Sequence, residues 1–363
     1  MTNSKQSESG KIRIGLVRAI LVDDDSIIQI INDNTDMEFI GSAQGMQAGI
    51  ELVRTFAPDI IIIEDIPDLP VFTNSVRTVS PNTGILLLSD TKNTSGAQHI
   101  VDALAAGAFD VVPAIDSSPT ASNLLLSRIR CCSIKQYSRL AKIGNKPANP
   151  LGNDGQKPAC IQNKNPVPQS SKYQAILIGV STGGPEALMD LLPEIHASIS
   201  LPIVIVLHMP KQFTGVMAEA LDRKCQIRVS EAVEGEVTVA GHAYLAPGGQ
   251  HCSLVSHPDH TLRIHLSDGP AENGCKPSVD VLFRSMPKEL GSKTIAVILT
   301  GMGNDGTNGA QTLKQNGALV IVQDEASSVV WGMPGSVVRA GIADEIHPLK
   351  NIAARLHELA GGI

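Results

Sequence analysis

The stretch AILIGVSTGGPEALMDLL at residues 175–192 determines how the second half of the chain folds. Its apolar start predicts a buried strand, its glycines predict a tight turn, and Pro185 is a preferred residue for the first turn of the helix that follows. This order of strand, turn and helix is typical of α/β folds built on a parallel sheet. It places Ser181 on the turn, at the carboxyl end of the strand.

Residues 179–183 match the pattern G-x-S-x-G, in which a serine nucleophile stands near backbone amides that can stabilise an oxyanion. A glycine-rich phosphate loop at a helix N-terminus is the alternative interpretation. The segment lacks the Lys-Ser/Thr ending of a Walker A loop and the full spacing of a dinucleotide-binding loop. A nucleophilic serine is therefore favoured.

Such a serine requires a base and an acid that orients the base. His208 follows a second apolar run at residues 203–207, and Asp305 lies in the glycine-rich segment after a third run at residues 295–300. Taken singly, His208 could be a packing residue and Asp305 a turn residue. Since the carboxyl ends of parallel strands meet at one edge, Ser181, His208 and Asp305 are expected to converge.

The composition bounds the protein class. At 363 residues the chain is long enough for two domains, and 42% hydrophobic with 18% charged residues is typical of a soluble globular protein. The net charge of −7 argues against nucleic acid as a partner. The N-terminus lacks a secretory signal, and no apolar run approaches the ~18 residues of a membrane span, so we expect a cytoplasmic protein that is not embedded in a membrane.

The cysteines and the remaining histidines give no metal or disulfide pattern. The six cysteines contain no C-x-x-C pair, and the neighbours Cys131 and Cys132 are interpreted as two unreactive thiols on one helix. Four histidines in a polar, hairpin-like stretch are predicted to be surface residues: His251, His257, His260 and His265.

A proline- and asparagine-rich segment divides the chain. Residues 141–172 hold no aromatic residue and cannot bury enough apolar surface to offset the entropy cost of ordering. We therefore expect folded units at residues 12–140 and 173–363, joined by a linker at 141–172, with the candidate catalytic residues in the second unit.

Four apolar runs in the first unit alternate with amphipathic stretches, and each run ends in polar residues or proline. The runs are 19–22, 59–63, 85–88 and 108–112, and their ends are Asp23-Asp24-Asp25, Glu64-Asp65, Ser89-Asp90 and Pro113. This pattern resembles the receiver domain of response regulators. In the family, an acidic pair and an Asp acceptor hold Mg²⁺, the Asp takes phosphate, and a Ser or Thr and a Lys complete the site. The matching residues here are Asp23 and Asp24 (with Asp25 as a register alternative), Glu64 as the acceptor, and Ser89.

Two of those positions depart from the receiver pattern. Glu64 carries its carboxylate one methylene further out than Asp, and Pro113 supplies no cation. Asp65 could accept phosphate only if its strand ended one residue later. We therefore expect a degenerate receiver in which Mg²⁺ binding and phosphorylation are doubtful, or a sheet whose acidic edge is simply solvated.

The second unit contains a series of ordered motifs: IGVSTGGPEAL at 178–188, His208-Met209-Pro210 with Phe213-Thr214, APGG at 246–249 with His251, PSVDVLF at 277–283, LTGMGNDG at 299–306, Gln323-Asp324-Glu325, and Gly332-Met333-Pro334. Together they resemble the chemotaxis protein-glutamate methylesterase family. The resemblance implies that Ser181 is the nucleophile, His208 the base and Asp305 its orienting acid. It also implies that Thr182 and Met302 line the site, with the Met302 amide as oxyanion donor.

The resemblance implies a fold of two doubly wound parallel sheets, a flavodoxin-like receiver and a Rossmann-like methylesterase. It implies hydrolysis of γ-glutamyl methyl esters on the cytoplasmic helices of methyl-accepting chemoreceptors, with deamidation of receptor glutamines in many members, and a chemotaxis histidine kinase as a further partner. No metal or other cofactor is implied for the ester chemistry, and the unphosphorylated receiver is expected to lie over the active site. Two alternatives remain open: an esterase of other specificity, and a non-catalytic interaction protein.

Overall fold

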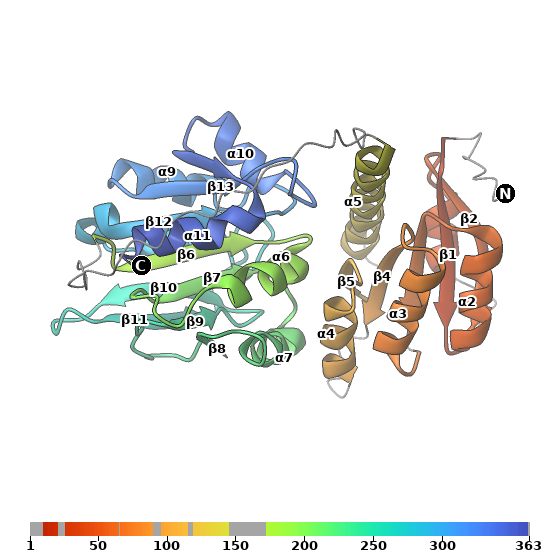
Figure 1. Cartoon of the computed structure of the whole chain (residues 1–363), viewed down its shortest axis with the longest axis horizontal. Helices are drawn as coiled ribbons and strands as arrows, with labels where there is room; N and C mark the ends of the chain where they lie inside the picture. The colour runs from red at the N-terminus through yellow and green to blue at the C-terminus, as the bar shows by residue number, and fades with distance from the viewer. Residues whose placement is uncertain are drawn as a thin grey trace, which may run out of the picture.

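The computed structural model describes residues 10–20, 26–64, 66–89, 96–114, 119–144 and 172–361, with side chains in the helix that begins at Pro119 described for 121–133. Figure 1 shows two α/β units lying side by side. Most of the predicted linker falls outside the described residues. The last helix before it runs to Gly144, four residues beyond the predicted boundary at 140.

The first unit is a five-stranded parallel sheet with helices between its strands. Its elements are β1 (Ile12–Arg18), α1 (Ser26–Asn32), β2 (Met37–Gln44), α2 (Gly45–Phe56), β3 (Ile60–Glu64), α3 (Leu69–Val79), β4 (Gly84–Ser89), α4 (Ala97–Ala105), β5 (Asp110–Pro113) and α5 (Pro119–Gly144). The strand order β2-β1-β3-β4-β5 is that of flavodoxin-like folds. Strands that are buried on both faces require continuous apolar runs, and residues 60–63 of β3, all isoleucine, are at most 1% exposed.

The first strand differs from the prediction. β1 spans Ile12–Arg18 rather than residues 19–22, and Ile20 is 73% exposed beyond its end. Polar and small residues interrupt the apolar pattern of β1, so its sequence contains no unbroken apolar run. Its residues Ile14, Leu16 and Val17 are nevertheless fully buried. Gly15 lies where Leu52 of α2 packs closely, because a Cβ there would stand 2.8 Å from the Leu52 Cδ2 atom. Because the strand ends at this point, Arg18 is the residue at the carboxyl end of β1.

The second unit contains a seven-stranded sheet in which every pairing is parallel, in the order β14-β13-β12-β6-β7-β9-β8. Its strands and the separate antiparallel hairpin are β6 (Ala175–Val180), β7 (Ile203–Leu207), β8 (Arg228–Glu231), β9 (His242–Leu245), β10 (His251–Ser256), β11 (Leu262–Ser267), β12 (Thr294–Ile298), β13 (Leu319–Gln323) and β14 (Glu345–His347). Its helices are α6 (Gly184–Leu191), α7 (Lys211–Asp222), α8 (Val279–Ser285), α9 (Thr307–Gln315), α10 (Met333–Arg339) and α11 (Leu349–Leu359), with short 3₁₀ turns η2 (Leu192–Glu194) and η3 (Lys288–Lys293). The fold class of two doubly wound parallel sheets is confirmed.

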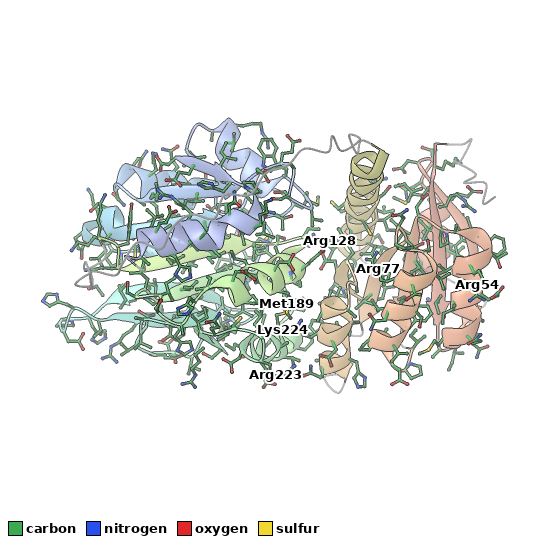
Figure 2. The ribbon with its side chains drawn as sticks, viewed as in Figure 1. Arg54, Arg77, Arg128, Met189, Arg223 and Lys224 are labelled. Atoms are coloured by element: carbon green, nitrogen blue, oxygen red, sulfur yellow. The ribbon has the colours of Figure 1, made fainter. Side chains whose placement is uncertain are left out.

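The two units pack against each other. Helix α4 contacts α6 and α7, and one apolar cluster continues from the first unit into the second. Figure 2 shows Met189 on α6, and Arg223 and Lys224 after α7, along the side of the second unit that faces the first. At the other end of the boundary, Val329 and Val330 pack against the core of the first unit. The contact therefore reaches the loops at the carboxyl edge of the larger sheet.

The helices of the described residues include none that is both long and apolar enough to cross a bilayer.

Candidate active site

Ser181 stands directly after β6, between two positions that require glycine. Gly183 has φ +75° and caps α6, and a Cβ there would lie 2.5 Å from Val329. A Cβ on Gly179 would lie 2.3 Å from the Cγ1 atom of Val279. The Ser181 N–H donates to the Thr300 carbonyl across the sheet at 3.0 Å. Close packing on both sides of the turn thus explains the G-x-S-x-G spacing and fixes the backbone of Ser181.

His208 and Asp305 meet at the same edge of the sheet. The His208 N–H donates to the Val180 carbonyl at 3.1 Å, which places the histidine beside Ser181 along neighbouring strand ends. The His208 Nε2 atom lies 2.8 Å from Asp305 Oδ2, and the two side chains are 11% and 3% exposed. The structure thus brings His208 and Asp305 into contact and places Ser181 at the end of the neighbouring strand.

The Asp305 carboxylate is held by a set of donors around the start of α8. Oδ2 accepts from the Val279 N–H at 2.7 Å, in addition to its bond with His208. Oδ1 accepts from the Ser278 hydroxyl at 2.8 Å, the Asp280 N–H at 3.1 Å and the Asn273 amide at 3.2 Å. A buried carboxylate with this many donors is stabilised in its ionised form and fixed in one orientation.

The pair has strongly shifted pKa values. Burial opposes protonation of His208, but its bonds to Asp305 and to Cys275 outweigh burial and raise the pKa of the imidazole to about 9. Burial likewise favours the neutral form of Asp305, but His208 and the donors at Val279 and Ser278 lower the pKa of that carboxyl to about 2. The ion pair is therefore the stable state of these two side chains around neutral pH.

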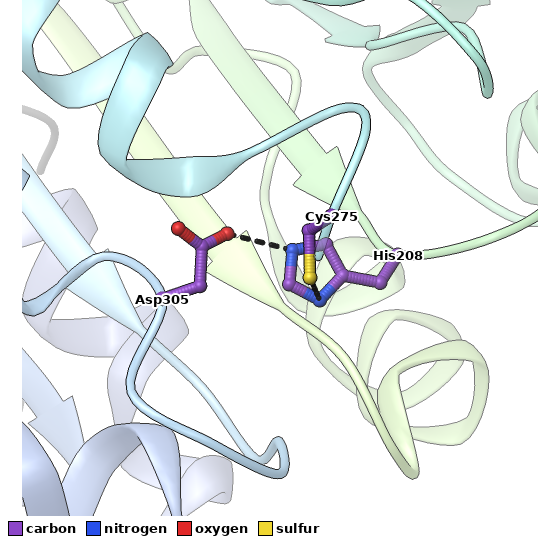
Figure 3. A group of neighbouring side chains, drawn as sticks. All are labelled: His208, Cys275 and Asp305. Carbon is purple, nitrogen blue, oxygen red and sulfur yellow. Dashed lines mark hydrogen bonds and ion pairs between the residues drawn. The ribbon is translucent and has the colours of Figure 1, made fainter. Parts of the chain in front are cut away.

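The second ring nitrogen of His208 contacts a thiol. Figure 3 shows Asp305 beside one nitrogen of the His208 ring and Cys275 over the face of the ring, and the Cys275 Sγ atom lies 3.5 Å from Nδ1. Among the described residues, no hydrogen bond joins the Ser181 hydroxyl to the ring. Since Asp305 holds Nε2, the nitrogen left to serve Ser181 is Nδ1. Catalytic hydrogen bonds are often long before substrate binds, so this geometry is compatible with a serine–histidine pair.

Thr182 and Met302 flank this edge in different ways. Thr182 is fully buried, and its carbonyl accepts from the Thr300 hydroxyl at 3.0 Å. Met302 is 45% exposed, and its sulfur accepts from the Ser127 hydroxyl of α5 at 2.9 Å and lies 3.9 Å from the Cys131 Sγ atom. Within the described ranges the Met302 N–H donates no hydrogen bond, as an oxyanion donor requires. Helix α5 of the first unit thus touches the loop expected to stabilise the oxyanion.

One of the four hairpin histidines is not a surface residue. His257, His260 and His265 are exposed as predicted, but His251 is only 3% exposed. Its Nε2 atom lies 2.9 Å from the Pro270 carbonyl, and its Nδ1 accepts from the Ser278 N–H at 3.2 Å. Buried polar groups require partners, and His251 finds both in the segment that leads into α8. It supports the residues that hold Asp305.

The predicted acidic edge of the first unit is occupied by an arginine. Arg18, which ends β1, is in register with Glu64 at the end of β3, and its guanidinium pairs with that carboxylate at 2.5 Å. Ser89 ends β4 and Pro113 ends β5, as predicted. Asp23, Asp24, Asp25 and Asp65 lie outside the described residues. The expectation that Asp23 directly follows β1 is wrong, because the strand ends five residues earlier.

Several residues that support the site were not singled out from the sequence as having a role. Cys275 and Asn273 lie in a tight turn far along the chain from His208, and no spacing rule connects them to it. Ser278, Val279 and Asp280 lie in the PSVDVLF motif, whose sequence predicts no separate role for each residue. That motif was the available signal, since it begins the helix that holds Asp305.

A seven-stranded parallel sheet with Ser181, His208 and Asp305 at its carboxyl edge defines the class: a two-unit α/β protein with the layout of a serine hydrolase. A sequence profile of the CheB methylesterase family matches residues 176–356. A protein of Desulfotalea psychrophila named protein-glutamate methylesterase/protein-glutamine glutaminase is 36% identical over 356 residues, which cover 93% of this chain and 97% of that protein. A second such protein, of Vibrio vulnificus, is 36% identical over 352 residues, with 94% and 98% covered.

A solved structure supports the same assignment. The crystal structure of the Thermotoga maritima CheB methylesterase catalytic domain is similar to this chain with a TM-score of 0.50 and 40% sequence identity, covering 52% of this chain and 98% of that one. The chain belongs to the CheB methylesterase family.

Proposed function

We propose that this protein hydrolyses γ-glutamyl methyl esters on the cytoplasmic helices of methyl-accepting chemoreceptors, releasing methanol, and that it deamidates receptor glutamines by the same chemistry. The observation that carries the proposal is the convergence of Ser181, His208 and Asp305 at one sheet edge in a chain of this family. Relatives carry both activities in their names. Both reactions pass through a tetrahedral intermediate, so one oxyanion site serves them.

The proposed mechanism assigns one step to each side chain. Ser181 Oγ attacks the ester carbonyl while Nδ1 of the neutral form of His208 accepts its proton and then delivers it to the departing methoxide. Asp305, fixed by the donors around α8, holds the ring through Nε2 and stabilises the imidazolium. The Met302 amide stabilises the oxyanion, and water then hydrolyses the acyl-enzyme by the reverse sequence of proton transfers. We assign no metal to this chemistry.

The first unit is proposed to restrain the site without ordinary phosphorylation. Contact between α5 and Met302 supports restraint. The residues at the described part of the receiver edge do not fit Mg²⁺, because Arg18 places a fixed positive charge against Glu64, where a divalent ion would need a free carboxylate. A chemotaxis histidine kinase remains a proposed partner, since binding does not require that its phosphate be accepted.

The proposed location is the cytoplasm, where the methylated helices of chemoreceptors lie. The finding that supports it is the family assignment.

The experiment is methanol release from methylated receptor by the full chain, with a simple carboxyl methyl ester assayed in parallel. Methanol formed in step with loss of receptor methyl groups is the expected result. Hydrolysis of the simple ester alone would favour an esterase of other specificity. Release from neither substrate would favour a non-catalytic protein.

A further inference from the structure

Thr300 lies between the turn that carries Ser181 and the loop that carries Met302. It follows β12, which is the neighbour of β6 in the sheet (Figure 1), and it is fully buried. The pairing of the two strands continues past their ends, because the Leu299 N–H donates to the Gly179 carbonyl at 2.9 Å and the Ser181 N–H donates to the Thr300 carbonyl at 3.0 Å. The backbone of Thr300 is therefore tied directly to the backbone of the nucleophile.

The other polar groups of Thr300 bind three further segments. Its N–H donates to the Gln323 Oε1 atom at 2.7 Å, so a side chain of β13 takes the place of a strand carbonyl. Its hydroxyl accepts from the Val330 N–H at 2.9 Å. The single hydroxyl hydrogen has two carbonyls within reach, that of Thr182 at 3.0 Å and that of Val330 at 3.3 Å. The hydroxyl thus joins the residue after the nucleophile to the segment at Val330.

The same segment holds the loop that begins at Gly301. The Gly301 N–H donates to the Val330 carbonyl at 3.0 Å, and the Gly301 carbonyl accepts from the Met333 N–H at 2.8 Å. A Cβ on Gly301 would stand 2.9 Å from the Ser181 Cβ and 2.4 Å from the Met333 sulfur. The loop backbone therefore lies directly against the nucleophile side chain, and the Met302 amide is the next one along the chain.

We propose that Thr300 is a positioning residue for acyl transfer, whose hydroxyl holds the Ser181 turn and the Met302 loop at the separation that the tetrahedral intermediate requires. The inference rests on the proposed function. Because Thr300 is fully buried, it acts through these two groups and does not touch substrate. Catalytic groups must be held to within roughly 0.5 Å, and a misplacement of about 1 Å can cost about 10²-fold in rate.

The test compares four forms of the full chain: wild type, Thr300→Val, Thr300→Ser and the matched control Thr294→Val. Thr294 begins β12 at the opposite end of the strand, is equally buried, and its hydroxyl donates to the Leu290 carbonyl at 2.8 Å. Its replacement by valine also removes a buried hydroxyl, but away from the site. Urea unfolding checks that each form is folded under the conditions of the assay.

Methanol release is the first readout. Thr300→Val should lower kcat and kcat/KM equally, by roughly 10²-fold, because it disturbs an arrangement that is used in the transition state. Thr300→Ser keeps the hydroxyl and should stay within about threefold of wild type, and Thr294→Val should match wild type. Should Thr300→Val fail to fold, Thr300→Cys replaces it, since a thiol is a weaker donor and acceptor than a hydroxyl. Wild-type kcat in the folded variant, or an equal loss in Thr300→Ser or Thr294→Val, would overturn the proposal.

The second readout needs no receptor. A fluorophosphonate reacts with a serine nucleophile: Ser181 Oγ forms the bond to phosphorus, fluoride leaves, and His208 takes the hydroxyl proton. Labelling should be slow in Thr300→Val and normal in Thr300→Ser and Thr294→Val. That pattern without methanol release from receptor by wild type would support the role of Thr300 and refute the proposed substrate alone. Equal labelling rates in wild type and Thr300→Val, or no labelling of wild type, would overturn the role of Thr300.

Discussion

Asp305→Asn perturbs the interaction on which the proposed base depends. The substitution keeps the shape of the side chain but removes its charge. In the wild type, Oδ2 of Asp305 accepts from the Val279 N–H and Oδ1 accepts from the Asp280 N–H. Whichever of these positions the NH₂ group of the new asparagine takes, it therefore faces a backbone N–H donor. We expect the pKa of His208 to fall from about 9 toward its ordinary value of 6.5, and turnover to fall because the ring is no longer held in the required tautomer.

Three magnitudes can be worked out for Asp305→Asn: the change in the His208 pKa, the loss of turnover and the loss of stability. A fall of the His208 pKa from about 9 to 6.5 corresponds to roughly 3 kcal/mol of lost preference for the imidazolium. Turnover should drop by about 10⁴-fold, the scale of the equivalent change in serine proteases. One buried donor left without an acceptor should lower the free energy of unfolding by a further ~1–3 kcal/mol.

The sign of the stability effect depends on pH. The raised pKa of His208 contributes stability that is fully present below pH 6.5 and is lost as pH rises through about 9. The lowered pKa of Asp305 contributes stability that is present above pH 3.8 and is lost as pH falls through about 2. The variant should therefore lose most stability between about pH 4 and 6.5, and the loss should shrink toward pH 9.

The assay is kcat/KM for methanol release across pH 5–10, together with urea unfolding at pH 6 and pH 9. Wild type should gain activity as pH rises through the pKa of His208, because the neutral ring is the base. The exposed Asp268 provides the control variant Asp268→Asn, which should leave the profile in place. An Asp305→Asn profile with an unchanged midpoint and near-normal turnover would refute the assignment of Asp305 as the orienting acid.

Three further predictions concern the first unit and the linker. Ser127→Asp places a carboxylate against Met302 and should raise methanol release several-fold by loosening α5. The control Asn74→Asp, at an exposed position on α3, should leave the rate unchanged. An unchanged rate in Ser127→Asp would contradict restraint through this contact. Acetyl phosphate with Mg²⁺ should leave little label and barely change activity, and stoichiometric phosphorylation at Asp65 with a several-fold rise would show that the acceptor lies one residue after Glu64. Limited proteolysis should cut first between Gly144 and Lys172 because of the composition of that segment, and a first cut within 180–300 would place the boundary elsewhere.

Strand ends were the most informative feature of the sequence. The runs before Ser181, His208 and Asp305 are continuous and apolar, so each strand could be located, and a parallel sheet brings their ends to one edge. The same reasoning failed at β1. In β1, Arg13, Gly15 and Arg18 interrupt the apolar pattern. The apolar run predicted to be the strand, residues 19–22, begins only after β1 has ended.

Contacts made by turns could not be predicted in the same way. Cys275 reaches His208 only because Asn273 and Glu272 anchor a tight turn to Asp305 and to α8, and these are tertiary contacts without a fixed sequence spacing. His251 is buried for a similar reason, since its partners at Pro270 and Ser278 lie well beyond its own hairpin strand. The polar composition of the hairpin correctly predicted that His257, His260 and His265 are exposed, but it wrongly predicted exposure for His251.

The most direct test of the central claim is methanol release from methylated receptor by wild type and by Ser181→Ala, at equal concentration and with folding checked by urea unfolding. Ser181 is small and 5% exposed, so its replacement by alanine should leave stability nearly unchanged. We predict that Ser181→Ala loses turnover by several orders of magnitude, and that His208→Ala added to it costs little more, because the residues act as a unit. Near-normal methanol release from Ser181→Ala would contradict the serine mechanism.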